Sequence, residues 1–233
     1  MQKRASILLC GLGLAAVLTS GCETGPPPDE TTADGLVRVA ARTSAGVYRA
    51  PDATFIQYKR VILEPPSISF TEDWARNHPE VEPKELQRLQ EETREVFRDE
   101  FTRVFVKRGP YHFADEPAAD VLLVVPSIEE LDIKSPEAGT VPGNSSYLTE
   151  RPVTMKVSGD LRDAATGKLV ARVITYHLAE RNPNGELRLA NRTANAQEQR
   201  RVYAEWSQVV REAIDVAKAA KPRTPHPSGL EPK

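Results

Sequence analysis

Two long windows without proline limit what this chain can fold into. Proline is frequent, at 19 of 233 residues, so a long gap between prolines that also shows helical periodicity predicts a helix. Pro83 suits the first helical position of the earlier window, 84–108, and Gly109-Pro110 ends it. Its apolar residues recur at three- and four-residue steps: Leu86, Leu89, Val96, Phe97, Phe101, Val104 and Phe105.

The later window, 197–221, has the same periodicity. One face contains Val202, Trp206, Val209, Ala213 and Val216, and neighbouring positions widen it with Tyr203, Val210, Ile214 and Ala217. Trp206 lies in the middle of this stripe, so we expect its side chain to be buried.

Between the two windows the apolar period changes to two. Residues 153–161 alternate apolar and polar side chains, which predicts a strand with one face in water. A turn at 163–168 leads to a second strand over 169–178, so these two strands should form a hairpin. The other predicted strands are the continuous apolar run 121–125, its neighbour 58–63 and a short segment at 186–189.

These elements predict an α+β fold in two layers, with a mixed sheet of four to five strands and both amphipathic helices packed on one face. We expect a single globular domain over 53–221. Residues 22–52 are expected to form a flexible tether, which the polar, proline-rich segment 23–32 indicates, while the structure of 30–52 stays open. The proline-rich end 222–233 is expected to be a disordered tail.

The first residues predict export. A positive start, Met-Gln-Lys-Arg, precedes an apolar run from Ala5 to Leu18 that is too short to span a membrane. Small residues follow, which completes the pattern of a secretory signal peptide over 1–21. The signal contains Cys10, so Cys22 would be the single thiol of the exported chain, without a disulfide partner.

Cys22 follows Leu18-Thr19-Ser20-Gly21, a segment that resembles the bacterial lipobox, although the pattern more often has leucine where this chain has Thr19. The resemblance implies a lipid on the Cys22 thiol, whose two or three acyl chains would hold the protein firmly on a membrane. An ordinary secretory signal with a chance cysteine is the alternative. Glu23 is not the aspartate that retains lipoproteins in the inner membrane of enteric bacteria. This rule favours the outer membrane, facing the periplasm.

Charge and composition exclude some classes of function. The formal net charge is −2 at pH 7, which argues against nucleic acid as a partner, because phosphates require a basic face. Hydrophobic residues make up 39% of the chain, enough for a packed core.

Several segments together resemble an uncharacterised bacterial lipoprotein family, domain of unknown function 3313. They are 58–66, the helix from Lys84, 118–125, 159–168 and Glu205-Trp206, so the resemblance covers most of residues 55–218. It implies a lipid-anchored envelope protein. The family has no established activity, so no functional residue is transferred from it.

Catalytic motifs are missing from the sequence. No serine lies in G-x-S-x-G, and no cysteine would remain as a free thiol. His177 and Glu180 are three residues apart, which places them on opposite faces of a strand, so we expect no metal site and no cofactor. Ser158 and Asp160 share one face, which a solvated strand explains. Carboxylates are plentiful, and an acid–base pair assembled by the fold stays open as an alternative.

The most basic surface is expected at Arg188, Arg192, Arg200 and Arg201. It could contact an anionic partner such as a lipid headgroup or cell-wall carboxylates, and a solvated loop and helix start is the competing interpretation. The leading hypothesis is therefore a non-enzymatic binding or accessory domain held in the envelope through Cys22, with a protein or cell-wall partner. The alternative is a cell-wall-active or other hydrolase.

Replacing the predicted lipid acceptor tests the anchor. Cys22→Ser should leave the protein in the soluble fraction or as an uncleaved precursor, because the thiol that receives the lipid is gone. Cell fractionation with immunoblotting measures both outcomes. A variant of mature size that stays in the membrane fraction would show that the anchor is wrong.

Overall fold

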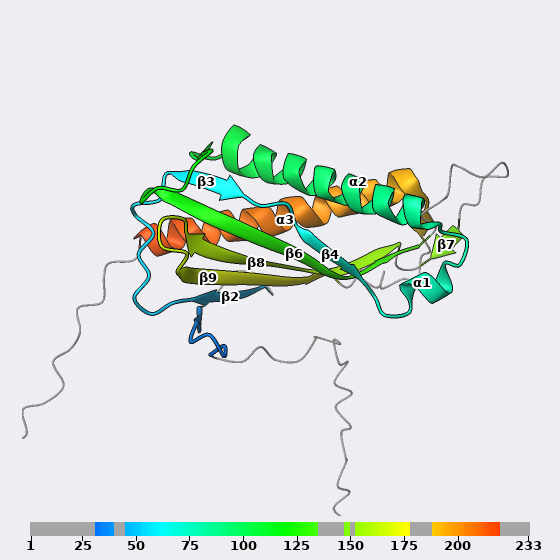
Figure 1. Cartoon of the computed structure of the whole chain (residues 1–233), viewed down its shortest axis with the longest axis horizontal. Helices are drawn as coiled ribbons and strands as arrows, with labels where there is room; N and C mark the ends of the chain where they lie inside the picture. Colours follow the sequence, from blue (N-terminus) through cyan, green and yellow to red (C-terminus); the bar gives the residue numbers. More distant parts are fainter. Residues whose placement is uncertain (1–30, 40–44, 135–146, 150–151, 178–187, 220–233) are drawn as a thin grey trace, which may run out of the picture.

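The computed structural model describes residues 31–39, 45–134, 147–149, 152–177 and 188–219. Within them one mixed sheet is covered on one face by two long helices, which confirms the α+β class (Figure 1). Three long strands form the centre of this sheet: β6 (Val121–Ile133), β8 (Val153–Asp163) and β9 (Leu169–His177). They pair antiparallel in the order β6, β8, β9.

The sheet has eight strands, so the prediction of four to five is wrong. Five of them are only two to four residues long: β1 (Val37–Val39), β2 (Gly46–Arg49), β3 (Arg60–Leu63), β4 (Ser67–Phe70) and β5 (His112–Phe113). β1 and β2 extend the sheet beyond β9, whereas β3 and β4 pair in parallel with successive parts of β6, and β5 lies beyond β3. β3 lies within the predicted strand at 58–63, whereas the other four are too short for an apolar period to reveal them.

A second, separate sheet pairs β7 (Tyr147–Thr149) with β10 (Arg188–Ala190). The predicted strand at 186–189 overlaps β10, although residues 186 and 187 lie outside the described part of the chain.

The domain start at 53 is also wrong, because residues 31–39 and 45–52 of the expected tether belong to the described fold. β2 pairs antiparallel with β9, and its Val47 and Tyr48 are buried at 4% exposure. β1 and β2 have three and four residues, too few for an apolar period to show in the sequence. The described fold therefore includes residues from Thr31 onward. The predicted signal peptide, Cys22 and the predicted tail at 222–233 lie outside the described residues.

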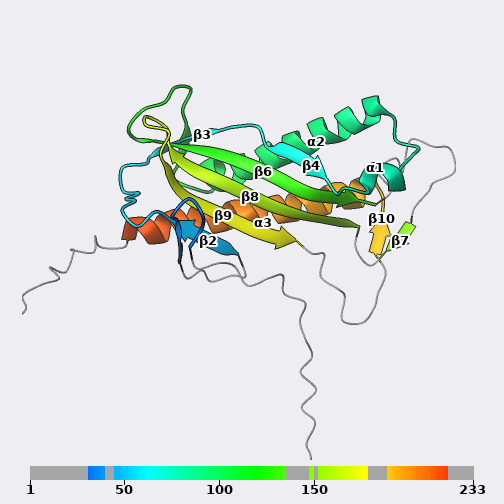
Figure 2. The same cartoon turned by 60° about the horizontal axis from the view of Figure 1, so that its bottom comes forward.

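Both predicted helices are present and run in the same direction side by side (Figure 2). α2 (Pro83–Thr102) begins at the predicted proline and continues as a π-helical turn, η1 (Arg103–Lys107). α3 (Arg192–Ala219) begins five residues before the predicted window. Arg211 of α3 donates a hydrogen bond to the Val104 carbonyl oxygen at 2.9 Å, which connects α3 to η1. A further helix of four residues, α1 (Trp74–Asn77), precedes α2.

Aromatic side chains fill the space between helices and sheet. Phe97 and Phe101 of α2 and Phe105 of η1 lie in a row, and the rings of Phe101 and Phe105 stack with centroids 4.1 Å apart. Tyr203 and Trp206 of α3 contact Phe97, with centroid distances of 5.3 and 5.5 Å. All five side chains are fully buried, which confirms the prediction for Trp206. Each contributes about 1.5–3 kcal/mol through burial.

Gly159 lies in the middle of β8, on the face that α3 covers. A Cβ atom at this position would be 2.5 Å from Cζ2 of Trp206, closer than real side chains approach. The indole ring therefore occupies the space that a side chain at Gly159 would need. The Trp206 Nε1 atom has no acceptor among the described residues, so close packing rather than a hydrogen bond holds this ring.

Adding one methyl group should test this contact. Gly159→Ala is expected to lower the free energy of unfolding by about 1–3 kcal/mol through overpacking, and Trp206→Ala by about 3–5 kcal/mol. The double variant should be more stable than the sum of the two losses predicts, because the smaller side chain at 206 makes room for the methyl group. Urea denaturation of the four chains measures this. If the two losses of unfolding free energy are strictly additive, the two side chains do not interact.

The N-terminal strands can be tested by truncation. A chain starting at residue 53 loses the buried side chains of Leu36, Val47 and Tyr48, so its free energy of unfolding should be lower by about 3 kcal/mol or more than that of a chain starting at residue 31. Denaturant melting of both chains decides the matter. Equal stability would mean that β1 and β2 add nothing to the fold.

Candidate functional site

The structure divides the predicted basic surface. Arg192 and Arg200 line one groove between α2 and α3. Arg201 instead bonds to Glu198, with Nη2 2.8 Å from Oε1. Of Arg188 the structure describes the backbone position in β10. The predicted basic surface is therefore not present as one surface among the described residues. Two of its four arginines, Arg192 and Arg200, line the groove.

This interhelical groove has a volume of about 270 Å³, just below the range of about 300–1,000 Å³ that is typical of small-ligand sites. Ile133, near the end of β6, forms part of its lining. The helices supply most of the rest: Leu89, Thr93 and Val96 from α2, and Asn195, Gln199 and Arg200 from α3.

Three buried polar side chains distinguish the groove from the aromatic core beside it. Thr93, Asn195 and Gln199 are 2%, 3% and 7% exposed. Asn195 Nδ2 donates to the Lys134 carbonyl oxygen at 2.8 Å, but its Oδ1 has no donor among the described residues. Gln199 Oε1 accepts a hydrogen bond from Tyr203 at 3.2 Å. An unpaired buried acceptor costs about 1–3 kcal/mol, which makes Asn195 a candidate for contact with a ligand.

A signal for these residues was present in the sequence. Asn195 and Gln199 continue the helical spacing of Val202 and Trp206 toward the start of α3, and Thr93 interrupts the apolar stripe of α2. Because the two helices are parallel, these polar side chains lie at the same level of both stripes. The sequence shows each of these polar residues separately, and only the packing of the two helices places Thr93 opposite Asn195 and Gln199.

Charged side chains at the rim of the groove are partly paired. Arg192 forms an ion pair with Glu92 across the two helices, and Arg88 bonds to both Glu85 and Glu92. The hydrogen bond from Arg88 lowers the pKa of Glu85. Arg200 has no ion-pair or hydrogen-bond partner in the part of the chain that the structure describes, so its guanidinium is available to a ligand.

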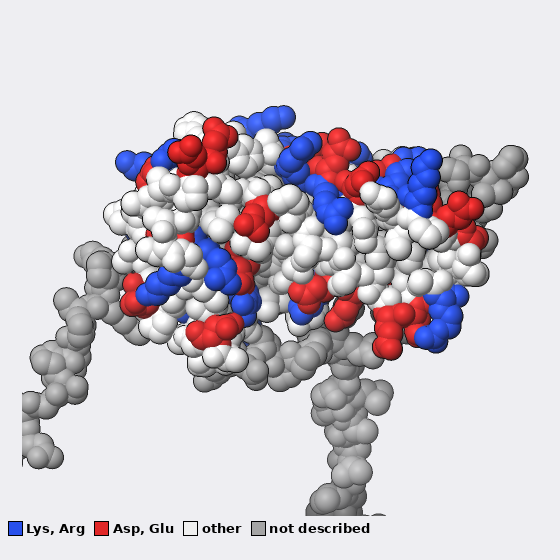
Figure 3. All heavy atoms as spheres, viewed as in Figure 1, with Lys and Arg blue, Asp and Glu red and all other residues white. Residues whose placement is uncertain are grey.

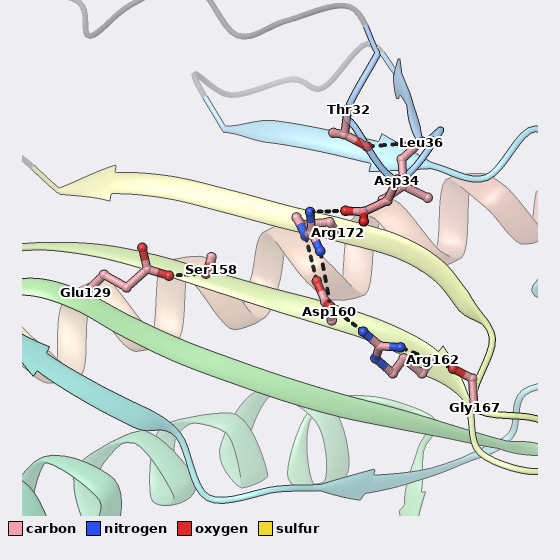
Figure 4. Close-up of polar contacts among 9 residues, drawn as sticks. All are labelled: Thr32, Asp34, Leu36, Glu129, Ser158, Asp160, Arg162, Gly167 and Arg172. Atoms are coloured by element: carbon pink, nitrogen blue, oxygen red, sulfur yellow. Dashed lines mark hydrogen bonds and ion pairs between the residues drawn. The ribbon is translucent and has the colours of Figure 1, made fainter.

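A second polar cluster lies on the opposite, helix-free face of the sheet (Figure 4). Lys156 Nζ is 2.7 Å from Glu129 Oε2, and Ser158 donates to Glu129 Oε1 at 3.2 Å. Asp160 accepts hydrogen bonds from Arg172 at 2.6 Å and from Arg162 at 2.9 Å. Ser158 and Asp160 do share one face, as predicted, but both are half-buried and hydrogen-bonded.

The ion pair with Lys156 holds Glu129 in its ionised form. Burial raises the pKa of Glu129, but the hydrogen bond and charge of Lys156 outweigh burial and keep this pKa below its usual value. Every carboxyl group with a shifted pKa among the described residues is shifted downward: Asp52, Glu85, Asp120, Glu129, Asp163 and Glu198. A general acid working at neutral pH needs the opposite shift.

His177 forms a buried contact with Glu198. Its Nε2 lies 2.9 Å from Glu198 Oε1, and the ionised carboxylate can only accept, so the ring nitrogen donates. This bond, with help from Arg201 and against the effect of burial, lowers the pKa of Glu198 to about 2. The contact joins the end of β9 to α3. Glu180, the residue considered from the sequence as a metal ligand together with His177, lies outside the described residues. Within the described residues, no group of three His, Cys, Asp or Glu side chains could hold a metal ion.

Acidic and basic side chains alternate over the face seen in Figure 3, without an extended area of one sign. The described helices include none that is long and apolar enough to cross a membrane.

Comparison with known proteins does not assign a family. No family model matches the sequence, and no curated protein matches it. Among solved structures, the PelC dodecamer from Paraburkholderia phytofirmans matches with 10% identity and a TM-score of 0.36, covering 71% of this chain and 96% of that chain. A point variant of the same dodecamer gives 11% identity and a TM-score of 0.35 at the same coverage. Likenesses this loose carry no argument about function.

The buried pair of His177 and Glu198 predicts a pH dependence. Because the pKa of Glu198 falls from 4.5 to about 2 on folding, its contribution is fully present above about pH 4.5 and is lost as the pH drops toward 2. Glu198→Gln should therefore lower the free energy of unfolding at pH 7 by about 1–3 kcal/mol, and the difference should shrink below pH 4.5. Denaturant melting at several pH values measures it.

Glu205→Gln is the matched control for this experiment. Glu205 lies on the same helix with its side chain 55% exposed, 3.9 Å from Arg201. We expect this variant to follow the wild-type profile. A pH-independent loss in Glu198→Gln would mean that the charge of Glu198 is not what stabilises the contact.

Proposed function

We propose that this protein is a bacterial envelope lipoprotein, held on the membrane by a lipid on Cys22, whose folded domain binds a partner through the interhelical groove. The lipobox-like segment before Cys22 supports the anchor. The lack of aspartate after Cys22 supports the outer membrane, with the domain in the periplasm. The resemblance to the family with domain of unknown function 3313 points to the same compartment.

The observation that carries the binding role is the polar floor of the groove. Folding normally leaves apolar side chains between two packed helices, yet Asn195 keeps a buried oxygen without a donor here. Arg200 adds an unpaired guanidinium at the rim among the described residues. One acceptor and one cation in a confined groove suit a ligand that has both a carboxylate and N–H or O–H donors. Cell-wall peptides contain both.

The hydrolase alternative has less support. An acid–base mechanism of the glycosidase type needs one carboxyl group that stays protonated near neutral pH. The shifted carboxyl groups of the described residues all move the other way, and Glu129 and Asp160 are each engaged by cations. Carboxylates arranged in this way stabilise the fold and hold neighbouring side chains in position.

The anchor and the groove are tested separately. Mass spectrometry of the N-terminal peptide from the membrane fraction should show a diacylglycerol thioether on Cys22. For the groove, the Cys22→Ser chain, produced without residues 1–21, is sedimented with purified peptidoglycan sacculi. Arg200→Glu in this background should weaken co-sedimentation by about tenfold, the equivalent of about 1.4 kcal/mol.

Arg108→Glu is the matched control, because Arg108 is equally a surface arginine but follows η1, at the far end of the helical layer. It should bind sacculi as the unmodified chain does. Equal loss in both variants would indicate a non-specific charge effect, and no loss in either would exclude the groove as a cell-wall contact.

A further inference from the structure

The N-terminal residues of the described fold lie against the helix-free face of the sheet. Asp34 Oδ2 is 2.7 Å from Arg172 Nη1, and Arg172 projects from the helix-free face of β9 (Figure 4). Leu36 is 1% exposed and packs with Tyr48 and Ile174 in a small apolar cluster separate from the main core. A hydrogen bond of 3.1 Å from the Leu36 amide to Thr32 Oγ1 closes the turn between them. The chain therefore enters the domain on the face opposite the helices.

This entry point limits how far the domain can lie from its anchor. If Cys22 carries the lipid, as the proposed function has it, only the nine residues 22–30 connect the membrane to Thr31. At full extension they reach about 30 Å. A bilayer on the helix side would require this segment to pass the thickness of a sheet and a helix, about 20 Å, which uses most of that reach.

The helix-free face has side chains suited to a headgroup layer. Tyr176 projects from it at 54% exposure, an aromatic ring with a polar end of the kind found at bilayer surfaces. Lys156 pairs with Tyr176 across the two strands, and its Nζ is 5.9 Å from the Tyr176 ring centroid. The carboxylates of Glu129 and Asp160 are each paired with a cation. Glu129 and, to a smaller extent, the exposed Glu130 raise the pKa of Lys156, so this ammonium stays charged beside the headgroups.

From these observations we infer that the helix-free face of the sheet, at Lys156 and Tyr176, contacts the lipid headgroups of the anchoring bilayer, while the helices and their groove face away from it. The inference rests on the proposed lipid at Cys22. It assigns the two faces separate tasks, since one lies on the membrane and the other is open to partners in the periplasm.

The orientation can be measured on the lipidated full-length mature protein. Apart from Cys22 the mature chain has no thiol, so single engineered cysteines accept a fluorescent label. Tyr176→Cys places the label on the helix-free face, and Gln208→Cys places it on the exposed side of α3, opposite Trp206. Both proteins are reconstituted in vesicles of phosphatidylethanolamine and phosphatidylglycerol that contain a headgroup-attached paramagnetic quencher.

We expect several-fold stronger quenching at position 176 than at 208. A flexible insertion of about 20 Gly and Ser residues after Glu23 should reduce this difference, because the longer segment releases the domain from the surface. Equal quenching at both positions in protein that stays on the vesicles would overturn the orientation while the anchor stands. Protein that does not float with the vesicles would refute the anchor itself, and the inference with it.

Discussion

The close approach of Trp206 to Gly159 sets the spacing between the two layers of this fold. The indole ring lies directly over the backbone of β8, where a Cβ atom would be 2.5 Å from it, and its other side meets Phe97 of α2. α3 therefore lies near the sheet at its middle, and α2 packs against both. The row of Phe97, Phe101 and Phe105 extends this contact along the helices. Since interiors are packed as densely as crystals, a single added methyl group is felt at such a point.

The groove begins where this aromatic packing ends. From Trp206 toward the start of α3 the stripe changes from apolar to polar, at Gln199 and then Asn195, and Thr93 interrupts the apolar stripe of α2 at the same level. The two helices remain connected there by the ion pair of Arg192 and Glu92. The part of the interface that we propose as the binding site therefore has buried polar side chains beside its apolar ones. This division is common, because a binding site and a well-packed core require different side chains in the same place.

Paired charges also connect the N-terminal residues to the sheet. The helix-free face has a network in which Asp160 accepts from Arg162 and Arg172, and Arg172 continues to Asp34. This network connects the N-terminal residues to the sheet, so the path toward Cys22 starts from a defined face. Exposed ion pairs add little stability on their own. Their effect here is on position: they hold Asp34 and its neighbours on the helix-free face of the sheet.

The amino-acid sequence alone determined the long elements, because periodicity over many residues averages out local exceptions. It predicted α2 from Pro83, most of α3, the hairpin of β8 and β9, the α+β class and the burial of Trp206. It missed β1, β2, β4 and β5, since two to four residues are too few to show a period and their pairing depends on distant strands. It predicted one basic surface, whereas the helix geometry turns Arg200 toward the groove and Arg201 toward Glu198. The tertiary structure alone decided that Thr93 lies opposite Asn195 and Gln199, because the chain positions of these residues contain no information about how two helices are aligned.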